Sequence, residues 1–504
     1  MSQPWEIENF LNARNGRLYV DGVSAIELAQ KHGTPLFVFS ESRIRHNVAR
    51  LKKAENLIGC PLKICYAAKA NSNMAILRTV KDAGSDIEVN SGGELWKALK
   101  IGFTPKQIIF NGTSKEVWEI ENAINAGIYA TQVDSIYELS LIEETARRLN
   151  KRANVSLRLV PEIETKTHSG LQTALLTSKF GMMPDEAFSA FRTYKDSEFL
   201  DLCGIHLHIG SQNPEAAPYA EAFSILFESL LRILDETGIK LKHINLGGGF
   251  PVNYLRDRSL ETAFRVEQRE MFSADFEPAD AIRNAWESVR DAAVTANASE
   301  LLENITLLLE PGRSVISDAG ICLTTVRNMK QRPLSAINKE LNAKIRAIEE
   351  ESLSDEKIDF GISHIERSFV DESTDKETWL LTDAGFNILL SMETYKWYYH
   401  LISAEQAEDA HIFPYKLAGP LCDGGDVYFD IEGQNRLPDY RPLPENVKPG
   451  EVLALLNCGA YSLAQASQYN GRFLPAVVLI PENGNAELVK KRERFEDLIS
   501  NDLF

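Results

Sequence analysis

The sequence lacks the marks of exported and membrane proteins. Its first twenty residues contain no basic segment followed by an apolar run, so we expect no signal peptide. No stretch approaches the roughly 20 consecutive apolar residues that a membrane helix needs. The six cysteines form neither a CxxC pair nor a zinc-like spacing. We therefore expect reduced thiols, no metal centre and a cytoplasmic protein.

Positive charge is also scarce. The 54 lysines and arginines are outnumbered by 72 aspartates and glutamates, which gives a net charge of −18. Nucleic acids and acidic membrane surfaces are therefore poor candidate partners. The hydrophobic content of 44% is that of a globular protein, and 504 residues are more than one ordinary domain needs. We expect two domains.

A repeated pattern of a short apolar strand, a turn and an amphipathic helix runs from about residue 62 to residue 314. The eight strand-like runs are LKICYAAKA, DIEVN, QIIFNG, ATQVDS, NVSLRLVP, LCGIHLHIGS, KHINLGGGF and ITLLLEPGRS. Eight such units over roughly 250 residues predict a closed (β/α)8 TIM barrel. An open doubly wound sheet is the alternative, but its GxGxxG fingerprint after the first strand is missing.

The pattern changes beyond Ser314 to short strand-like runs separated by turns, which predicts a mostly-β C-terminal domain. The N-terminal stretches GRLYVDGV and TPLFVFS have the same character, and we expect both to join that sheet. We therefore predict an N-terminal segment at 1–40, the barrel at 41–314 and the β domain at 315–504. Two charged segments, 251–280 and 333–376, have the composition of insertions, for which a solvated surface excursion is favoured over a binding element.

Candidate functional residues stand at the carboxyl ends of the predicted barrel strands, where such barrels hold their active sites. Lys69 ends the first strand, and alternation places it on one face with Lys63, Cys65 and Ala67. The small side chains of Cys65 and Ala67 leave room for a ligand. An imine-forming lysine needs a partly sheltered position of this kind, although a surface charge remains the alternative.

The sixth and seventh strands end in residues that suit an anion. His206 and His208 share one face of the sixth strand, either as polar core residues or as ligands, and Ser211 follows them. The seventh strand ends in Gly247, Gly248 and Gly249, whose backbone N–H groups can converge on a phosphate, unless they only form a tight turn.

The eighth strand ends in Glu310 and Arg313, three residues apart. Glu310 is suited to hold a proton on a heterocyclic nitrogen, and Arg313 to bind a phosphate or a carboxylate. An internal salt bridge is the alternative. In the β domain, the turn GPLCDGGD contains Cys422 and Asp423, and CGAYS contains Tyr461. Structural turns would explain both of these motifs as well.

Ten segments in a fixed order carry a likeness to a known family: YAAKAN, EVNSGGEL, FNGTSK, SKFGM, GIHLHIGSQ, NLGGGFP, EPGRS, DAGFN, GPLCDGGD and GAYS. With them the chain resembles the fold-type III, alanine-racemase-like decarboxylases that use pyridoxal 5′-phosphate (PLP). These act on diaminopimelate, ornithine, arginine and carboxyspermidine-type substrates. The resemblance runs from TPLFVFS to KRERFEDLI, which is nearly the whole chain.

The resemblance implies PLP as the cofactor and a role for each matching residue. Lys69 matches the lysine that binds PLP as an imine, and His208 the histidine that stacks on the pyridine ring. Ser211, Gly247, Gly248 and Gly249 match the phosphate site, Arg313 an arginine that contacts phosphate or substrate, and Tyr461 a tyrosine near the phosphate.

Two further matches concern the reaction. Glu310 matches the carboxylate that keeps the pyridine nitrogen protonated; racemases of this fold use an arginine there, so the glutamate indicates decarboxylation. Cys422 matches the cysteine that reprotonates the substrate carbon from a second subunit. The resemblance therefore implies a homodimer with shared active sites.

The chain departs from diaminopimelate decarboxylases at two substrate positions. Cys422 is followed by Asp423 and glycine instead of Glu-Ser, and Ser391 replaces the arginine of an Arg-Pro-x-x-Tyr segment of which Tyr395 remains. Loss of that arginine disfavours a substrate with a distal carboxylate. We therefore expect an α-decarboxylase of a diamino acid of the ornithine or lysine type. A meso-diaminopimelate decarboxylase that makes L-lysine is the alternative, as is a non-catalytic regulatory homologue.

Overall fold

The computed structural model describes residues 3–256, 264–333, 376–434 and 436–503. The chain forms two compact units. One comprises residues 43–252 and 274–317, and the other comprises residues 1–42, 253–273 and 318–504. Part of the predicted insertion at 251–280 thus belongs to the second unit. The predicted insertion at 333–376 falls almost entirely outside the described residues.

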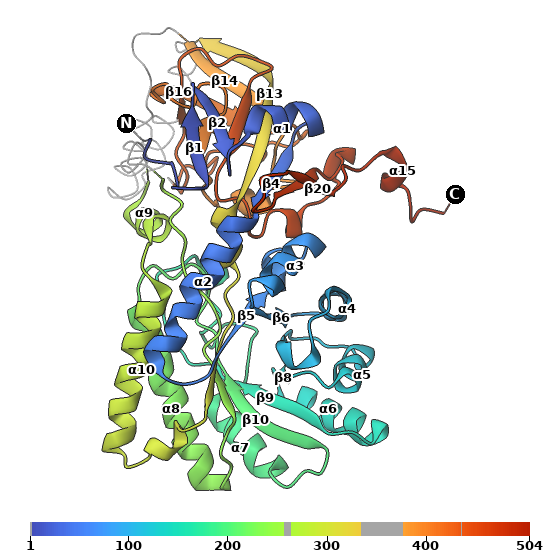
Figure 1. The fold of residues 1–504 in the computed structure, drawn as a ribbon, viewed down its shortest axis with the longest axis vertical. Helices are drawn as coiled ribbons and strands as arrows, with labels where there is room; N and C mark the ends of the chain where they lie inside the picture. The colour runs from blue at the N-terminus through green and yellow to red at the C-terminus, as the bar shows by residue number, and fades with distance from the viewer. Residues whose placement is uncertain (1–2, 257–263, 334–375, 435, 504) are drawn as a thin grey trace, which may run out of the picture. The chain divides into compact units, whose positions relative to one another are not determined.

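The first unit is built on a closed barrel of parallel strands (Figure 1). In chain order the strands are β5 (Leu62–Ala67), β6 (Asp86–Val89), β7 (Ile108–Phe110), β8 (Ala130–Val133), β9 (Ala153–Arg158), β10 (Leu200–His206), β11 (His243–Asn245) and β12 (Thr306–Leu309). Pairing of β12 with β5 and of β9 with β10 closes the ring. Each strand overlaps one predicted strand-like run, although β9 and β10 begin one and two residues before theirs, so the predicted (β/α)8 barrel is confirmed.

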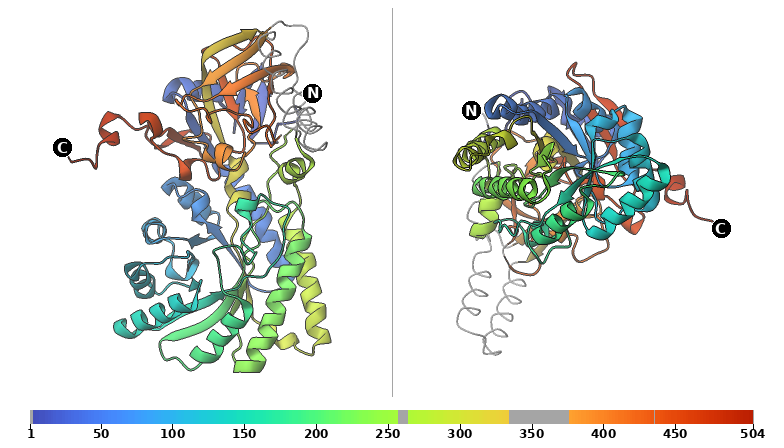
Figure 2. Two further views of the ribbon diagram at one scale, coloured as in Figure 1. Left: turned by 180° about the vertical axis from the view of Figure 1, so that it is seen from behind. Right: turned by 90° about the horizontal axis from the view of Figure 1, so that it is seen from below.

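Helices surround the barrel, as the right-hand view of Figure 2 shows. They are α2 (Glu41–Ile58), α3 (Met74–Asp82), α4 (Gly92–Ile101), α5 (Val117–Ala126), α6 (Ile136–Leu149), α7 (Pro184–Tyr194), α8 (Ala217–Thr237) and α10 (Pro278–Thr295), with the short α11 (Arg313–Ile316) after β12. Local signals set their ends. The Ser91 and Ser135 hydroxyls accept N–H bonds in the first turns of α4 and α6, and Gly102 ends α4 in the left-handed conformation.

The second unit contains a mixed sheet whose main path runs β17 (Arg441–Leu443), β16 (Phe413–Ala418), β14 (Lys376–Thr382), β13 (Gly320–Pro333), β4 (Leu36–Ser40), β19 (Ala476–Ile480) and β20 (Glu487–Lys490). Beside this path, β18 (Val452–Leu455) pairs with β13 and with β15 (Leu401–Ser403). Every residue of β4 is buried in the sheet. The predicted mostly-β domain, completed by an N-terminal strand, is therefore confirmed.

The N-terminal stretch GRLYVDGV does not join that sheet, and this part of the prediction is wrong. It forms β2 (Arg17–Val20) and β3 (Val23–Ser24), which pair with β1 (Leu11–Arg14) in a separate three-stranded sheet. The turns are Asn15-Gly16 and Asp21-Gly22, and all four residues have positive φ. Asn-Gly and Asp-Gly pairs favour tight hairpins, so the segment folds back on itself.

Smaller helices complete the second unit: α1 (Ala25–His32), α9 (Val266–Ser273), α14 (Leu390–Thr394) and α15 (Phe495–Leu498). The first hairpins and α1 contribute apolar residues such as Trp5, Leu18 and Leu28 to a core shared with β4, β13 and β19. Across the described parts of the chain, none of the helices has the length and apolarity to span a membrane.

Candidate active site

Lys69 stands just beyond the first barrel strand. Strand β5 ends at Ala67, and Lys69 lies in a 3-10 turn, Ala68–Ala70. The predicted alternation of Lys69 with Lys63 and Cys65 is therefore wrong, because the extended strand ends at Ala67 and the 3-10 turn breaks the alternating pattern. The alanines beside Lys69 are buried, whereas its own side chain is 40% exposed. The Lys69 side chain is thus partly exposed between two buried neighbours.

Glu310 lies buried after β12 within a ring of polar side chains. Its two carboxylate oxygens accept hydrogen bonds from the Asn111 amide at 2.9 Å and the Asn245 amide at 2.7 Å. The Nε2 atom of His206 is 3.6 Å from the same carboxylate. Burial acts to raise the pKa of Glu310, but His206 and Lys69 outweigh it and hold the pKa below its usual value. We conclude that Glu310 is ionised.

The two histidines of the sixth strand have different positions. His206 ends β10 and is buried, whereas His208 follows the strand and accepts a hydrogen bond at Nδ1 from the Gly248 N–H, at 3.0 Å. Burial lowers the pKa of both imidazoles. The hydrogen bond that His208 accepts at Nδ1 leaves the proton of its neutral imidazole on Nε2.

The three glycines after β11 are required by close backbone packing. A Cβ atom at Gly248 would lie 2.3 Å from the Glu310 carbonyl oxygen, and one at Gly249 would lie 2.5 Å from the Gly210 carbonyl oxygen. Gly247 and Gly249 also have positive φ. Nearby, the Arg313 Nε donates to the Ser211 hydroxyl at 3.2 Å. The carboxyl ends of β10, β11 and β12 thus gather the residues that the sequence assigned to an anion site.

Sequence reasoning missed two charged residues at this end of the barrel. Glu88, in β6, is fully buried, and its Oε1 lies 3.8 Å from the Lys69 Nζ. Arg158 ends β9, with its guanidinium 4.4 Å from the Phe180 ring centroid. Burial, opposed by Lys69 and reinforced by Glu310, raises the pKa of Glu88 to about 7. Arg158 could have been found by examining the polar residue at the end of its strand, whereas Glu88 lies within a short strand and has no such signal.

The remaining predicted residues belong to the β-rich unit, and two of them, Cys422 and Asp423, lie in the turn GPLCDGGD. Buried Asp426 accepts the N–H groups of Phe386 and Leu421, each at 2.8 Å, which ties this turn to the DAGFN segment. The Cys422 N–H donates to the Asn470 side chain at 2.7 Å, and Cys422 itself is exposed. Asp423 accepts a hydrogen bond from the Tyr469 hydroxyl at 3.1 Å. The turn is thus fixed from both sides.

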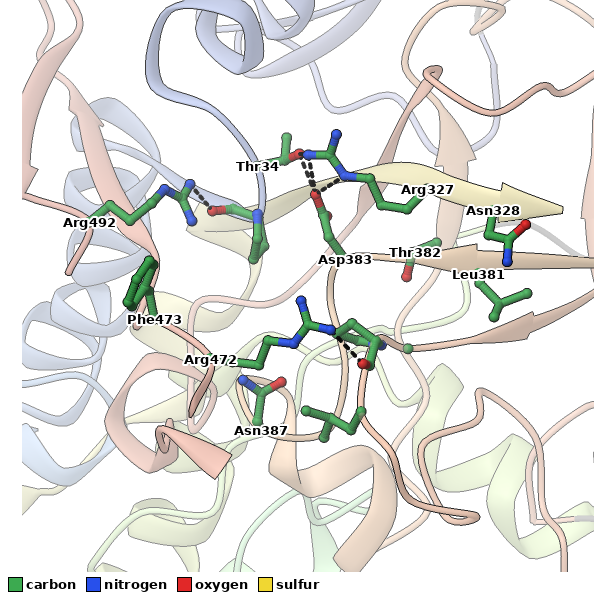
Figure 3. Close-up of a pocket in the computed structure, with 14 residues that line it drawn as sticks. Thr34, Arg327, Asn328, Leu381, Thr382, Asp383, Asn387, Arg472, Phe473 and Arg492 are labelled. Carbon is green, nitrogen blue, oxygen red and sulfur yellow. Dashed lines mark hydrogen bonds and ion pairs between the residues drawn. The ribbon is translucent and has the colours of Figure 1, made fainter. Parts of the chain in front are cut away.

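A cavity of about 530 Å³ lies next to this turn in the same unit (Figure 3). Arg327 and Thr34 both bond to Asp383 on its wall. Arg472 donates to the Pro420 carbonyl at 2.8 Å, two residues before Cys422. Arg492 donates to the Pro35 carbonyl. The three arginines in the cavity wall are therefore engaged in bonds to the turn and to the sheet edge.

Ser391, Tyr395 and Tyr461 also lie in this unit. Ser391 is buried in α14, and its hydroxyl donates to the Gln465 side chain at 3.3 Å. Tyr395 is the C-terminal cap of α14, and Tyr461 takes the left-handed conformation with a φ of 57°. Arg256, in the same unit, donates to the Asn457 side chain at 2.7 Å.

The barrel region corresponds to a known family. The family described as pyridoxal-dependent decarboxylase, pyridoxal binding domain, matches residues 42–317. The chain belongs to this family. The resemblance inferred from the ten sequence segments is therefore confirmed, and the protein is a PLP-dependent carboxy-lyase of the diaminopimelate and ornithine decarboxylase group.

Two curated relatives that match over nearly their whole length are named diaminopimelate decarboxylase. Diaminopimelate decarboxylase of Methanocaldococcus jannaschii is 33% identical over 496 residues, covering 97% of this chain and 96% of its own. The Aquifex aeolicus enzyme is 31% identical, covering 99% of this chain and 98% of its own. A crystal structure of the M. jannaschii enzyme matches with a TM-score of 0.76 at 32% identity, covering 98% of each chain.

The decarboxylase presents residues that fit its PLP cofactor. Both ring nitrogens of His206 and both carboxylate oxygens of Glu88 are buried without a hydrogen-bond partner among the described residues. The ionised Glu310 lies close to them, as does the glycine segment Gly247–Gly249. Because glycines have no side chain, a ligand can approach the backbone of this segment directly. Unsatisfied buried polar atoms beside such a segment are the arrangement expected of a binding site for a polar ligand.

Proposed function

We propose that Lys69 binds PLP and that Glu310 holds the proton of its pyridine nitrogen. The main support is that the Lys69 amine and the ionised Glu310 carboxylate stand at the same end of the barrel, next to the glycine segment. Bound PLP supplies a protonated ring that withdraws the electron pair left on the substrate carbon when CO2 departs. Two amide donors and a neighbouring histidine keep Glu310 charged, as this role requires.

The other barrel residues orient the cofactor in this proposal. His208 packs on the ring face; its neutral imidazole is already fixed by the Gly248 N–H. Ser211, Gly247, Gly248 and Gly249 bind the phosphate through a hydroxyl and backbone N–H groups, and Arg313 adds its charge beside Ser211. From the β-rich unit, Tyr461 contributes to the phosphate site.

Cys422 returns a proton to the substrate carbon in this proposal, serving the barrel of a second subunit in a homodimer. Two observations support the choice of this thiol. It is the exposed cysteine among those that the structure describes, and its turn is fixed by Asn470 and Asp426. A proton donor has to be held in one position to act on a single face of the substrate carbon.

We infer that the substrate is a diamino acid with one carboxylate, of the ornithine or lysine type. Asp423 and Glu393 both approach Gly425: a Cβ atom there would lie 3.4 Å from Asp423 Oδ1 and 3.2 Å from Glu393 Oε1. Lys396 pairs with Glu393 at 2.8 Å, so the negative charge of Asp423 remains to bind a distal ammonium group. Tyr395 adjoins this cluster in sequence and completes the proposed substrate site with Ser391 and Arg313.

A second candidate is the decarboxylation of meso-diaminopimelate to L-lysine. It is favoured by the full-length relatives, which are named diaminopimelate decarboxylases, and by a crystal structure of one of them in complex with L-lysine, 31% identical to this chain. The presence of Ser391 argues against this candidate, because diaminopimelate decarboxylases usually have an arginine at this position to bind the distal carboxylate. A non-catalytic regulatory role is disfavoured because Lys69, Glu310 and Cys422 are all present.

The substitution Ser391→Arg separates the two candidates. Wild type is expected to prefer D- or L-lysine or ornithine over meso-diaminopimelate, since no guanidinium stands at position 391. Ser391→Arg is expected to shift the ratio of kcat/KM toward meso-diaminopimelate by about ten- to a hundred-fold, the value of one charge-assisted hydrogen bond of roughly 1.5–3 kcal/mol.

Ser391→Met is the matched control, because it also adds a long side chain but no charge. Both variants lose the hydrogen bond from the Ser391 hydroxyl to Gln465. Ser391→Met should lower kcat/KM for all substrates without changing their order. A wild type that already prefers meso-diaminopimelate tenfold or more would establish the second candidate and reject the first.

A further inference from the structure

Glu88 is a buried carboxylate that the roles proposed so far leave unused. Its side chain has no exposed surface, and neither carboxylate oxygen has a hydrogen-bond partner among the residues that the structure describes. Burying a carboxylate without donors is costly unless it is neutral or lies beside a cation. The cation within ion-pair distance is the Lys69 amine, whose Nζ is 3.8 Å from Glu88 Oε1.

Charged and titratable groups face Glu88 from several neighbouring elements. They are Lys69 in the turn after β5, Glu310 after β12, Glu94 in α4, Arg158 at the end of β9 and Cys65 within β5. Lys69 favours the ionised form of Glu88, while Glu310 and Glu94 disfavour it. The Arg158 guanidinium adds a positive charge to the same region. The charge of Glu88 therefore depends on whether the neighbouring lysine is protonated.

The two buried carboxylates of the site differ in their surroundings. Glu310 receives two amide hydrogen bonds and faces His206, so its negative charge is fixed. Glu88 has no such donor at hydrogen-bond distance, and the Asn111 amide lowers its pKa less than burial raises it, so that the pKa is about 7, near neutral pH. A carboxyl group with a pKa near the operating pH is suited to accept and return a proton. Only one of the two carboxylates is thus built to change its charge.

We propose that Glu88 is a positioning residue that exchanges a proton with the Nζ of Lys69. When the amine is prepared for attachment to the cofactor, an N–H bond of the Lys69 ammonium breaks and an O–H bond forms on Glu88. The ion pair becomes a neutral amine and a neutral acid, and no other reactant is needed. When Lys69 is released, the same proton returns. This inference rests on the proposed attachment of PLP to Lys69 and is independent of the substrate's identity.

The test is the pH titration of the visible absorbance of PLP bound to the enzyme, in wild type and in Glu88→Gln. The absorbance reports the protonation of the nitrogen that joins Lys69 to the cofactor. A carboxylate within ion-pair distance raises the pKa of a cation by about one to three units, so Glu88→Gln should lower the titration midpoint by about one to three pH units. Glu88→Asp, which keeps the charge at a greater distance, should give an intermediate midpoint.

Asp86→Asn is the matched control. Asp86 lies two residues earlier on the same strand, and its carboxylate pairs with Lys63 at 2.5 Å instead of with Lys69. Asp86→Asn should leave the titration midpoint unchanged. The control therefore separates the effect of losing a charge beside Lys69 from the effect of altering strand β6. If Glu88→Gln does not bind PLP, the titration midpoint of Glu88→Asp shows whether the carboxylate at position 88 affects the nitrogen of Lys69.

An unchanged midpoint in PLP-loaded Glu88→Gln, or in Glu88→Asp where the former does not load, would overturn this proposal. Borohydride treatment of wild type is done first, because it fixes PLP on the residue to which PLP is attached. Fixation on a residue other than Lys69 would reject the proposed function itself. Fixation on Lys69 with no shift of the midpoint would reject the role of Glu88 alone.

Discussion

The Lys69→Ala protein is expected to lose both its borohydride-fixed PLP and its decarboxylase activity. Lys69 provides the amine just beyond the carboxyl end of β5, and its side chain is partly exposed. Removing a group that both attaches the cofactor and moves a proton should lower kcat on the order of 10²–10⁴-fold. Peptide mass mapping after reduction identifies the labelled residue directly.

Lys63→Ala is the control for this experiment. Lys63 lies on the same strand, but its amine is paired with Asp86, so its removal should leave the fixed cofactor on Lys69. Unaltered fixation of PLP in Lys69→Ala, or transfer of the label to Lys63, would reject the assignment of Lys69.

A mixture of Lys69→Ala and Cys422→Ala proteins is expected to recover up to about a quarter of wild-type activity, although each is nearly inactive alone. Random exchange makes half of the dimers mixed, and each mixed dimer has one intact site of two. The recovery follows if the barrel of one subunit is served by Cys422 of the other. Activity is measured before and after exchange, with exchange followed by mass labelling.

The control mixture is Lys69→Ala with Glu310→Gln. Both residues belong to the barrel unit, so no dimer in this mixture has an intact site and no activity should return. Absence of recovery in the first mixture despite proven exchange, or a fully active monomer, would reject shared sites.

The fold could be predicted because its signals are periodic. Eight apolar runs alternating with amphipathic helices leave few architectures, and each strand from β5 to β12 overlaps one of the predicted runs. The separate N-terminal sheet was missed because the turns Asn15-Gly16 and Asp21-Gly22 were not weighed as hairpin signals. Hydrophobic pattern alone does not tell which sheet a strand joins.

The candidate site was only partly accessible to sequence reasoning. Residues that stand out by type, such as Lys69, Glu310 and the glycine segment, could be recognised. Glu88 could not, since a glutamate within a short strand has the pattern of a solvent-exposed position; only barrel closure reveals that it is fully buried beside Lys69. The pairing of Asn111 and Asn245 with Glu310 joins three different strand ends and has no local signal.

The central claim, that this PLP enzyme decarboxylates a diamino acid with one carboxylate, is tested most directly by CO2 release. PLP-loaded wild type is incubated with meso-diaminopimelate and with the D- and L-forms of lysine, ornithine and arginine, with Lys69→Ala as the blank. We predict CO2 release from lysine or ornithine at a kcat/KM above that for meso-diaminopimelate, and none from Lys69→Ala. Release of no CO2 from any of these amino acids, or release from meso-diaminopimelate alone, would contradict the claim.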